Sequence, residues 1–119
     1  MSSESYSLGA FPTTRLRRLR QHPRLRELTR GTRLHAGQLL YPLFVRGGKG
    51  VRQEINSMPG VYQLSLDELE KEVREVAELG IGGVLLFGIP DEKDPTGTDS
   101  FADDGIVQQA LRVVKKAAP

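Results

Sequence analysis

Two apolar runs separated by a strongly patterned helix constrain the fold of this 119-residue chain more than any other feature. The runs cover residues 39–45 and 82–88, and neither alternates between apolar and polar residues. Strands buried on both faces of a parallel sheet have such continuous apolar sequences, and two parallel strands need a long crossover that is usually helical. The order strand, helix, strand therefore predicts a parallel βαβ unit in an α/β protein.

The connection between the two runs carries clear helix signals. Ser65 and Glu68 match the S-x-x-E capping box, in which each side chain accepts a hydrogen bond from the other residue's backbone amide. Gly80 is placed to end the helix in a left-handed conformation. The apolar residues between them form one helical stripe: Leu66, Leu69, Val73, Val76 and Ala77. The carboxylates of this helix have the spacing of a solvated face, and a second amphipathic helix is expected over residues 105–117.

The two predicted strands are too few for a complete sheet. Sheets average about five or six strands, so either a partner or the rest of the same chain is expected to complete this one. Pro42 lies in the first run and cannot donate a ladder hydrogen bond, so the strand is expected to become regular only from Leu43. Residues 55–62 are interpreted as a direct connection from this strand to the helix.

Residues 15–33 form a basic segment with eight arginines in nineteen positions. Leucines at 16, 19, 25 and 28 recur three residues apart, which predicts two short amphipathic pieces, and Pro23 fits the first turn of the second. Residues 1–52 hold eleven Lys and Arg against two acids, whereas residues 53–119 hold six against thirteen. This division favours an acidic partner for the first half, such as the second half of another copy. Three roles stay open: an intersubunit arm, a site for an anion or allosteric ligand, and a nucleic-acid contact.

Composition disfavours several classes of protein. The chain has no cysteine, so its own residues can form neither disulfides nor thiolate metal sites. No apolar run approaches the ~18 residues of a membrane span, and the start lacks the basic and apolar regions of a secretory signal. The glycine-rich residues 46–50 do not match the P-loop pattern, and no aromatic residue lies among the arginines of residues 15–33. A cytoplasmic protein that does not contact membranes is expected.

Candidate metal ligands are few. His22 and His35 have no second ligand at a suitable spacing and are expected on the surface of the basic segment. Six acids in the loop after the second run could bind Mg²⁺ through oxygen: Asp91, Glu92, Asp94, Asp99, Asp103 and Asp104. They lack the regular alternation of an EF-hand loop, so solvated loop charge is the favoured interpretation and no metal ligand is assigned.

Five segments of the chain resemble, in order and spacing, the amino-terminal third of the porphobilinogen synthase (5-aminolevulinate dehydratase) family. They are TRLRR at 14–18, LLYPLFV at 39–45, INSMPGVYQLS at 55–65, LGIGGVLLFGIP at 79–90 and DDGIVQQALRVVKK at 103–116. The SMPG and LFGIP blocks together are specific, whereas either alone is weak. The resemblance implies an arm, residues 1–35, followed by the first two βα units of a (β/α)8 TIM barrel, residues 36–119, with the barrel incomplete in this chain.

The resemblance also implies a reaction, the condensation of two 5-aminolevulinate molecules to porphobilinogen with loss of two waters in tetrapyrrole (heme) synthesis. Family members use two Schiff-base lysines, together with zinc on a cysteine cluster or with Mg²⁺. These groups follow position 119 in the family's order, so the segment alone is expected to be inactive, with no catalytic residue and no metal ligand. The implied partners are 5-aminolevulinate and other copies in a homo-oligomer, commonly an octamer.

Phe87 is the one residue expected near substrate. It lies at the carboxyl end of the second strand, and ligands bind beyond the carboxyl ends of the strands in such folds. The same position also suits an aromatic residue of the barrel core. None of the five lysines lies in a segment that would form the desolvated pocket that a Schiff-base lysine needs. The alternative function is a small basic-armed α/β binding module that contacts nucleic acid or an acidic protein.

Overall fold

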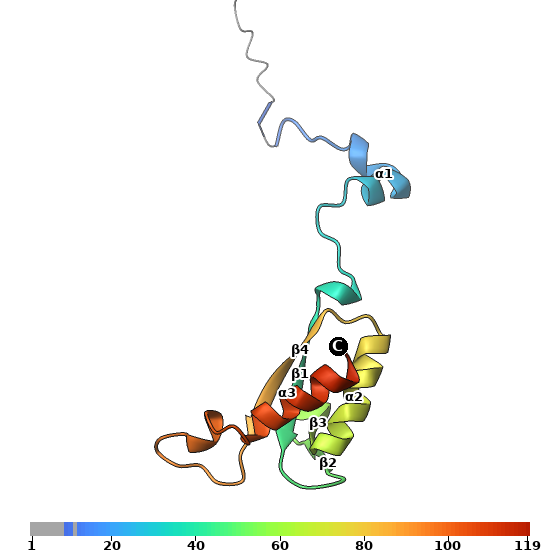
Figure 1. Ribbon diagram of the computed structural model, residues 1–119. Coiled ribbons are helices and arrows are strands. Elements are labelled where there is room, and N and C mark those ends of the chain that lie inside the picture. Colours follow the sequence, from blue (N-terminus) through green and yellow to red (C-terminus); the bar gives the residue numbers. More distant parts are fainter. Residues whose placement is uncertain (1–8, 11) are drawn as a thin grey trace, which may run out of the picture. The chain divides into compact units, whose positions relative to one another are not determined.

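The computed structural model describes residues 9, 10 and 12–119, and the chain divides into two compact units, Met1–Arg33 and Leu34–Pro119. Figure 1 shows the first unit as short helical pieces and the second as a sheet with helices. No helix among the described residues is long and apolar enough to cross a bilayer.

The first unit, called the arm below, contains the 3₁₀ helix η1 (Arg18–Arg20) and the helix α1 (Pro23–Leu28). Pro23 occupies the first turn of α1, as predicted, where its missing N–H costs no helical hydrogen bond. His22 caps this helix, because its Nδ1 accepts a hydrogen bond from the Arg24 amide at 3.2 Å. None of the described arm residues is buried, so these residues form no apolar core among themselves.

The second unit contains a sheet of four strands, β1 (Leu40–Arg46), β2 (Arg52–Ile55), β3 (Met58–Leu64) and β4 (Gly83–Ile89), in the order β2-β3-β1-β4. Strand β1 pairs in parallel with β4 along its whole length, from Leu40 opposite Gly83 to Arg46 opposite Ile89. The predicted parallel βαβ unit is therefore confirmed. A short 3₁₀ helix, η2 (Ala36–Gln38), precedes β1.

Strands β2 and β3 were missed by the sequence interpretation, which took residues 55–62 as a plain connection. They form an antiparallel hairpin, and β3 also pairs in parallel with β1 at Phe44 and Val45. The prediction of an irregular start to β1 was also wrong, because Pro42 lies in register with Leu85. At Pro42 the strand has a paired neighbour only on the β4 side, so its open side tolerates the missing donor.

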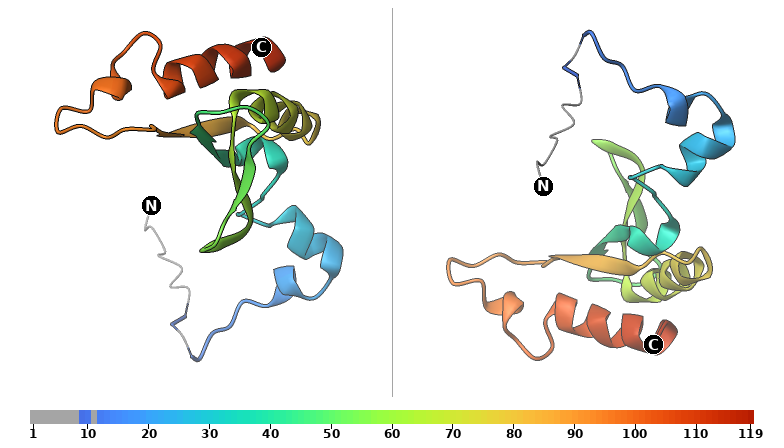
Figure 2. Two further views of the ribbon diagram at one scale, coloured as in Figure 1. Left: turned by 90° about the horizontal axis from the view of Figure 1, so that it is seen from below. Right: turned by 90° about the horizontal axis from the view of Figure 1, so that it is seen from above.

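Helices α2 (Leu66–Glu78) and α3 (Ile106–Ala117) pack on one face of the sheet, as the two views in Figure 2 show. The apolar stripes of both helices pack against the residues of β1 and β3 that face the helices. The core contains Leu43, Val45, Leu64, Leu69, Val73, Ile106 and Ala110. Because side chains alternate along a strand, the residues between Leu43 and Val45 and on either side of them face away from these helices.

The start of α2 differs from the predicted capping box. The Ser65 side chain makes no hydrogen bond to the first turn of the helix backbone, and Glu68 pairs with Lys71 instead. The Ser65 hydroxyl is drawn away by the preceding loop, where it accepts a hydrogen bond from the Val51 amide at 2.9 Å. The other end of α2 agrees with the prediction, since Gly80 has a φ of 71° and its amide donates to the Ala77 carbonyl.

The opposite face of the sheet is apolar and open. Leu40, Leu85 and Phe87 expose 69%, 49% and 44% of their surface. In a TIM barrel this face points into the barrel, where layers of side chains from other strands would cover it. A 3₁₀ helix, η3 (Thr98–Ser100), lies in the long loop between β4 and α3.

Candidate functional site

The candidate site is the edge of the sheet where the parallel strands end. Strands β1, β3 and β4 point the same way, so Arg46, Leu64 and Ile89 all lie at this edge. In parallel α/β sheets, ligands bind beyond the carboxyl ends of the strands. The loops that leave this edge are residues 47–51 after β1 and residues 90–105 after β4.

Phe87, the predicted substrate contact, lies near this edge on the open face of the sheet. Its ring stacks on that of Phe44, with the ring centroids 5.2 Å apart and the planes at 17°. The two residues are direct neighbours in the β1–β4 register, which explains the contact. The pair presents a flat apolar surface close to the carboxyl ends of both strands.

Arg46, at the end of β1, adds a positive charge to the same edge. Its Nη1 donates to the side-chain oxygens of Gln53, at 3.0 Å, and Gln63, at 3.3 Å. The hairpin thus holds the guanidinium in place, while Nε is buried without a hydrogen-bond partner among the described residues. Sequence reasoning did not single out Arg46, because both glutamines belong to the hairpin it missed. The available signal was a charged residue directly after an apolar strand.

The loops after β1 and β4 meet at this edge around a cavity of about 230 Å³. A Cβ atom on Gly47 would lie 2.6 Å from Asp91 Oδ2, so a larger residue at position 47 would displace the Asp91 carboxylate. Asp67, at the start of α2, stabilises the loop of residues 47–51, because its Oδ2 accepts a hydrogen bond from the Gly50 amide at 2.9 Å. The Ser65 hydroxyl and this amide both hold the pKa of Asp67 below its ordinary value.

Two of the acids of residues 91–104, Asp94 and Asp99, accept hydrogen bonds from nearby backbone and hydroxyl groups. Asp94 accepts from the amide and the hydroxyl of Thr98, which lower its pKa. Asp99 Oδ2 accepts from the Ile106 amide at the first turn of α3, at 3.4 Å. Within the described part of the chain, no group of three or more His, Cys, Asp or Glu could hold a metal ion.

A second polar network joins the sheet to α2 away from the loops. The Tyr41 hydroxyl donates to Glu72 at 3.2 Å, and Glu72 forms an ion pair with Arg52 at 3.0 Å. Arg52 lies 4.4 Å over the ring of Tyr62. Burial, followed by the nearby Glu72 charge, raises the pKa of Tyr41. The network holds the hairpin against the helix.

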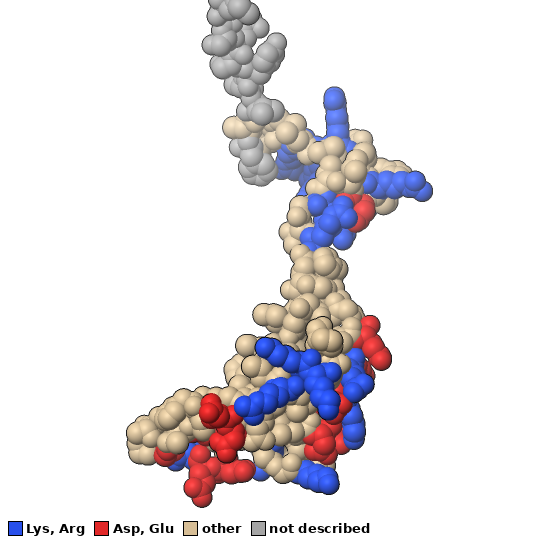
Figure 3. Space-filling view, viewed as in Figure 1, with Lys and Arg blue, Asp and Glu red and all other residues tan. Residues whose placement is uncertain are grey.

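Charge is unevenly distributed over the two units. Figure 3 shows basic side chains gathered on the arm and both signs mixed over the sheet unit. Glu27 is the one acid among the described arm residues, and it pairs with Arg30 at 3.5 Å and Arg33 at 3.3 Å.

Comparison with known proteins assigns this arrangement to a family. The family model described as delta-aminolevulinic acid dehydratase matches residues 13–119. The chain belongs to the delta-aminolevulinic acid dehydratase family. The predicted family resemblance is therefore confirmed.

Individual dehydratases of this family agree over most of the chain. Delta-aminolevulinic acid dehydratase of Halalkalibacterium halodurans is 54% identical over 105 residues, which is 88% of this chain and 32% of that protein. The Synechococcus elongatus dehydratase is 50% identical over 109 residues, 92% of this chain and 33% of that protein. The chain thus spans about a third of the length of these curated relatives.

A solved dehydratase structure confirms the fold. The Toxoplasma gondii enzyme, crystallised with its reaction product porphobilinogen, superposes with a TM-score of 0.82 at 34% identity, over 89% of this chain and 30% of that chain. The sheet unit is accordingly part of a TIM barrel, with the open apolar face of β1 and β4 on its inside. These matches do not favour the alternative of a stand-alone binding module.

Proposed function

We propose that this chain forms the arm and the first two βα units of a porphobilinogen synthase, which condenses two 5-aminolevulinate molecules to porphobilinogen with loss of two waters. The observation that carries the proposal is the family match over residues 13–119. The barrel geometry of β1 and β4 supports it, because their carboxyl ends lie where TIM barrels bind substrates.

Phe87 would form part of the substrate pocket. Its place near the carboxyl end of β4 and its 44% exposure on the inner face support this role. Stacking on Phe44 fixes the plane of the ring, so the ring could orient the carbon chain of a small keto acid without hydrogen bonding to it.

The Schiff-base lysines would come from the rest of the enzyme. All five lysines of this chain are exposed, and a Schiff base needs a neutral amine, which desolvation provides. The pKa of Lys71 is raised by its hydrogen bond to Glu68, which favours the charged form. By resemblance to the family, the ligands of its zinc or magnesium ion would also lie outside this segment.

The arm would join copies of the enzyme into a homo-oligomer, an octamer by resemblance to the family. Leu28 is 77% exposed, although leucines are usually buried. The excess of basic residues in residues 1–52 and of acidic residues in residues 53–119 favours contact between different copies. We place the enzyme in the cytoplasm.

A chimeric enzyme tests the proposal. The 105 matching residues of the Halalkalibacterium halodurans protein would be replaced by the aligned residues of this chain. We expect the chimera to form porphobilinogen from 5-aminolevulinate, measured by a colorimetric assay of product. A folded, soluble chimera without activity would contradict the proposed function.

The role of Phe87 is tested in the same chimera with two variants. Phe87→Leu should raise the KM for 5-aminolevulinate about tenfold, because part of an apolar pocket wall is lost. Leu85→Ala is the matched control, since Leu85 lies on the same strand and face but two residues further from the carboxyl edge. It should lower stability and leave KM unchanged. Equal KM values for Phe87→Leu and the parent would assign Phe87 to the barrel core alone.

A further inference from the structure

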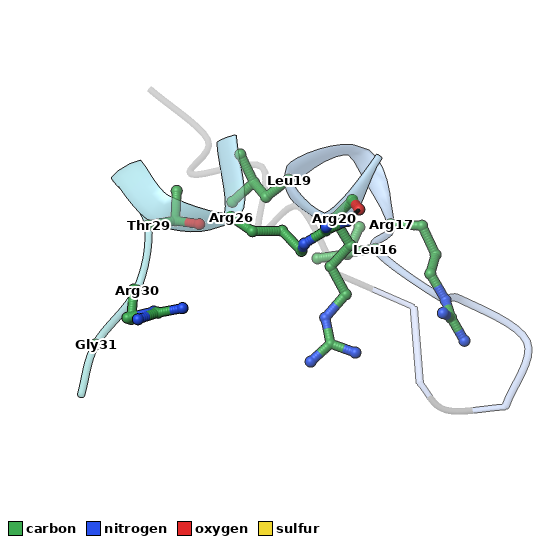
Figure 4. Close-up of a pocket in the computed structure, with 8 residues that line it drawn as sticks. All are labelled: Leu16, Arg17, Leu19, Arg20, Arg26, Thr29, Arg30 and Gly31. Atoms are coloured by element: carbon green, nitrogen blue, oxygen red, sulfur yellow. Dashed lines mark hydrogen bonds between the residues drawn. The ribbon is translucent and has the colours of Figure 1, made fainter. Parts of the chain in front are cut away.

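The arm contains a pocket that the proposed reaction does not use. Its lining residues come from two segments, 16–20 around η1 and 26–31 around the end of α1, and its volume is about 860 Å³. Figure 4 shows its lining side chains, all of which belong to the arm. Arg26 Nη1 donates to the Arg20 carbonyl at 3.0 Å, which holds α1 against η1 and keeps the pocket in shape.

Four guanidinium groups border this pocket, from Arg17, Arg20, Arg26 and Arg30. In Figure 4 the Arg17 and Arg20 side chains extend to the same side, and Arg30, in the segment that follows α1, points toward the Arg20 side chain. Glu27 pairs with Arg30, but no carboxylate among the described residues pairs with Arg17 or Arg20. Bringing like charges together is unfavourable, and an anion placed among them would offset this repulsion.

Two leucines supply an apolar side to the same pocket. Leu16 and Leu19 border it and remain 77% and 57% exposed. Guanidinium groups bind phosphate and carboxylate oxygens through paired N–H donors, while leucines favour contact with hydrocarbon. The combination suits a ligand that carries several negative charges beside an apolar part.

We infer that the arm pocket binds a small, multiply charged anion, with phosphate or carboxylate groups on the arginines. 5-Aminolevulinate carries one carboxylate and one ammonium group and has no net charge, so it is a poor match to a pocket bordered by four arginines. Among the described residues, no aromatic side chain lines the pocket to stack a nucleotide base, which disfavours single-stranded nucleic acid. The inference is independent of the barrel reaction and describes a second binding site.

Titration calorimetry on the 119-residue chain tests this inference, with tripolyphosphate and citrate as probes for phosphate and carboxylate chemistry. The same titrations on the chimera, which carries the same arm, provide a second measurement if the chain alone is poorly soluble. We expect one anion per chain with at least one probe, weakening as salt rises from about 50 to 200 mM. The probe that binds more tightly identifies the class of the natural ligand.

Matched double variants separate a formed pocket from general positive charge. Arg20→Ala with Arg30→Ala removes two pocket arginines, whereas Arg18→Ala with Arg24→Ala removes two charges of the same segment that do not line the pocket. The first pair should weaken binding at least about tenfold and the second less than about threefold. Equal losses, absence of binding by both probes, or tighter binding of a short single-stranded oligonucleotide would each overturn the inference.

Discussion

Replacing Ser65 with alanine should loosen the loop after β1. Ser65 is completely buried, and its hydroxyl accepts from the Val51 amide at 2.9 Å while donating to Asp67 Oδ1 at 2.6 Å. Asp67 in turn holds the Gly50 amide. The Ser65 hydroxyl and the Asp67 carboxylate therefore together join the loop after β1 to the start of α2.

The size of the effect follows from the amide left behind. In Ser65→Ala, the partly buried Val51 N–H loses its acceptor, and an unsatisfied donor of this kind costs about 1–3 kcal/mol. The loss makes local opening easier by the same free energy. Amide exchange at Val51 should accelerate roughly 5- to 150-fold, since each ~1.4 kcal/mol corresponds to a factor of ten.

Hydrogen exchange with mass spectrometry on the chimeric barrel measures this change in the peptide spanning residues 47–52. Ser57→Ala, in the exposed turn between β2 and β3, is the control and should leave the peptide unchanged. The explanation fails if Ser65→Ala alters exchange less than about threefold, or if Ser57→Ala has an equal effect.

Four further outcomes are expected. Because the pKa of Asp67 is lowered in the folded protein, its contribution to stability is present above the unfolded pKa and is lost as pH falls through the folded pKa. Protection of the Gly50 amide from exchange should therefore persist at about pH 4 and decline at lower pH. Asp67→Asn should remove this pH dependence. Borohydride reduction of the 119-residue chain with 5-aminolevulinate should give no stoichiometric adduct by mass spectrometry; an adduct on any lysine would show that a Schiff-base residue is present here. Gly82→Ala should destabilise the chimera by about 1–3 kcal/mol in urea unfolding, because its Cβ would lie 2.2 Å from the Gly37 carbonyl oxygen, whereas Gly31→Ala meets no atom within 4 Å and should be tolerated. The isolated chain should self-associate at micromolar concentration through its open strand edge and exposed inner face, and sedimentation showing a monomer, with a cooperative thermal transition above about 50 °C, would contradict this.

The elements that sequence alone predicted are those whose signals are local. Helix α2 is buried on one face and shows an apolar stripe over residues 66–77, whereas β1 and β4 show continuous apolar runs typical of strands covered on both faces. These patterns were sufficient to predict the three elements. Strand β2 was missed because three of its four residues, Arg52 to Glu54, are exposed and polar. Its strand conformation comes from pairing with β3, which a search for apolar runs cannot detect.

The candidate site shows the same division. The position of Phe87 at the carboxyl edge followed from the end of an apolar run, but its stacking on Phe44 depends on the register between strands 43 residues apart in the chain. Ser65 looked like a helix cap because the pattern is local, yet the Val51 amide competes for its hydroxyl. Tertiary contacts thus decided both the role of Ser65 and the fixed position of Arg46. Whether Phe87 touches substrate stays a prediction.

The brief pairing of β3 with β1 bears on how such a barrel is closed as the chain is synthesised. Strand β1 leaves the ribosome first, and in a closed barrel its second neighbour is the last strand made. Until that strand is made, β3 pairs with the carboxyl-terminal part of β1, at Phe44 and Val45. This pairing shields part of an otherwise exposed strand from pairing with other nascent chains. The final strand could then pair only with the residues of β1 that precede Phe44. The hairpin would therefore also limit the register in which the barrel closes.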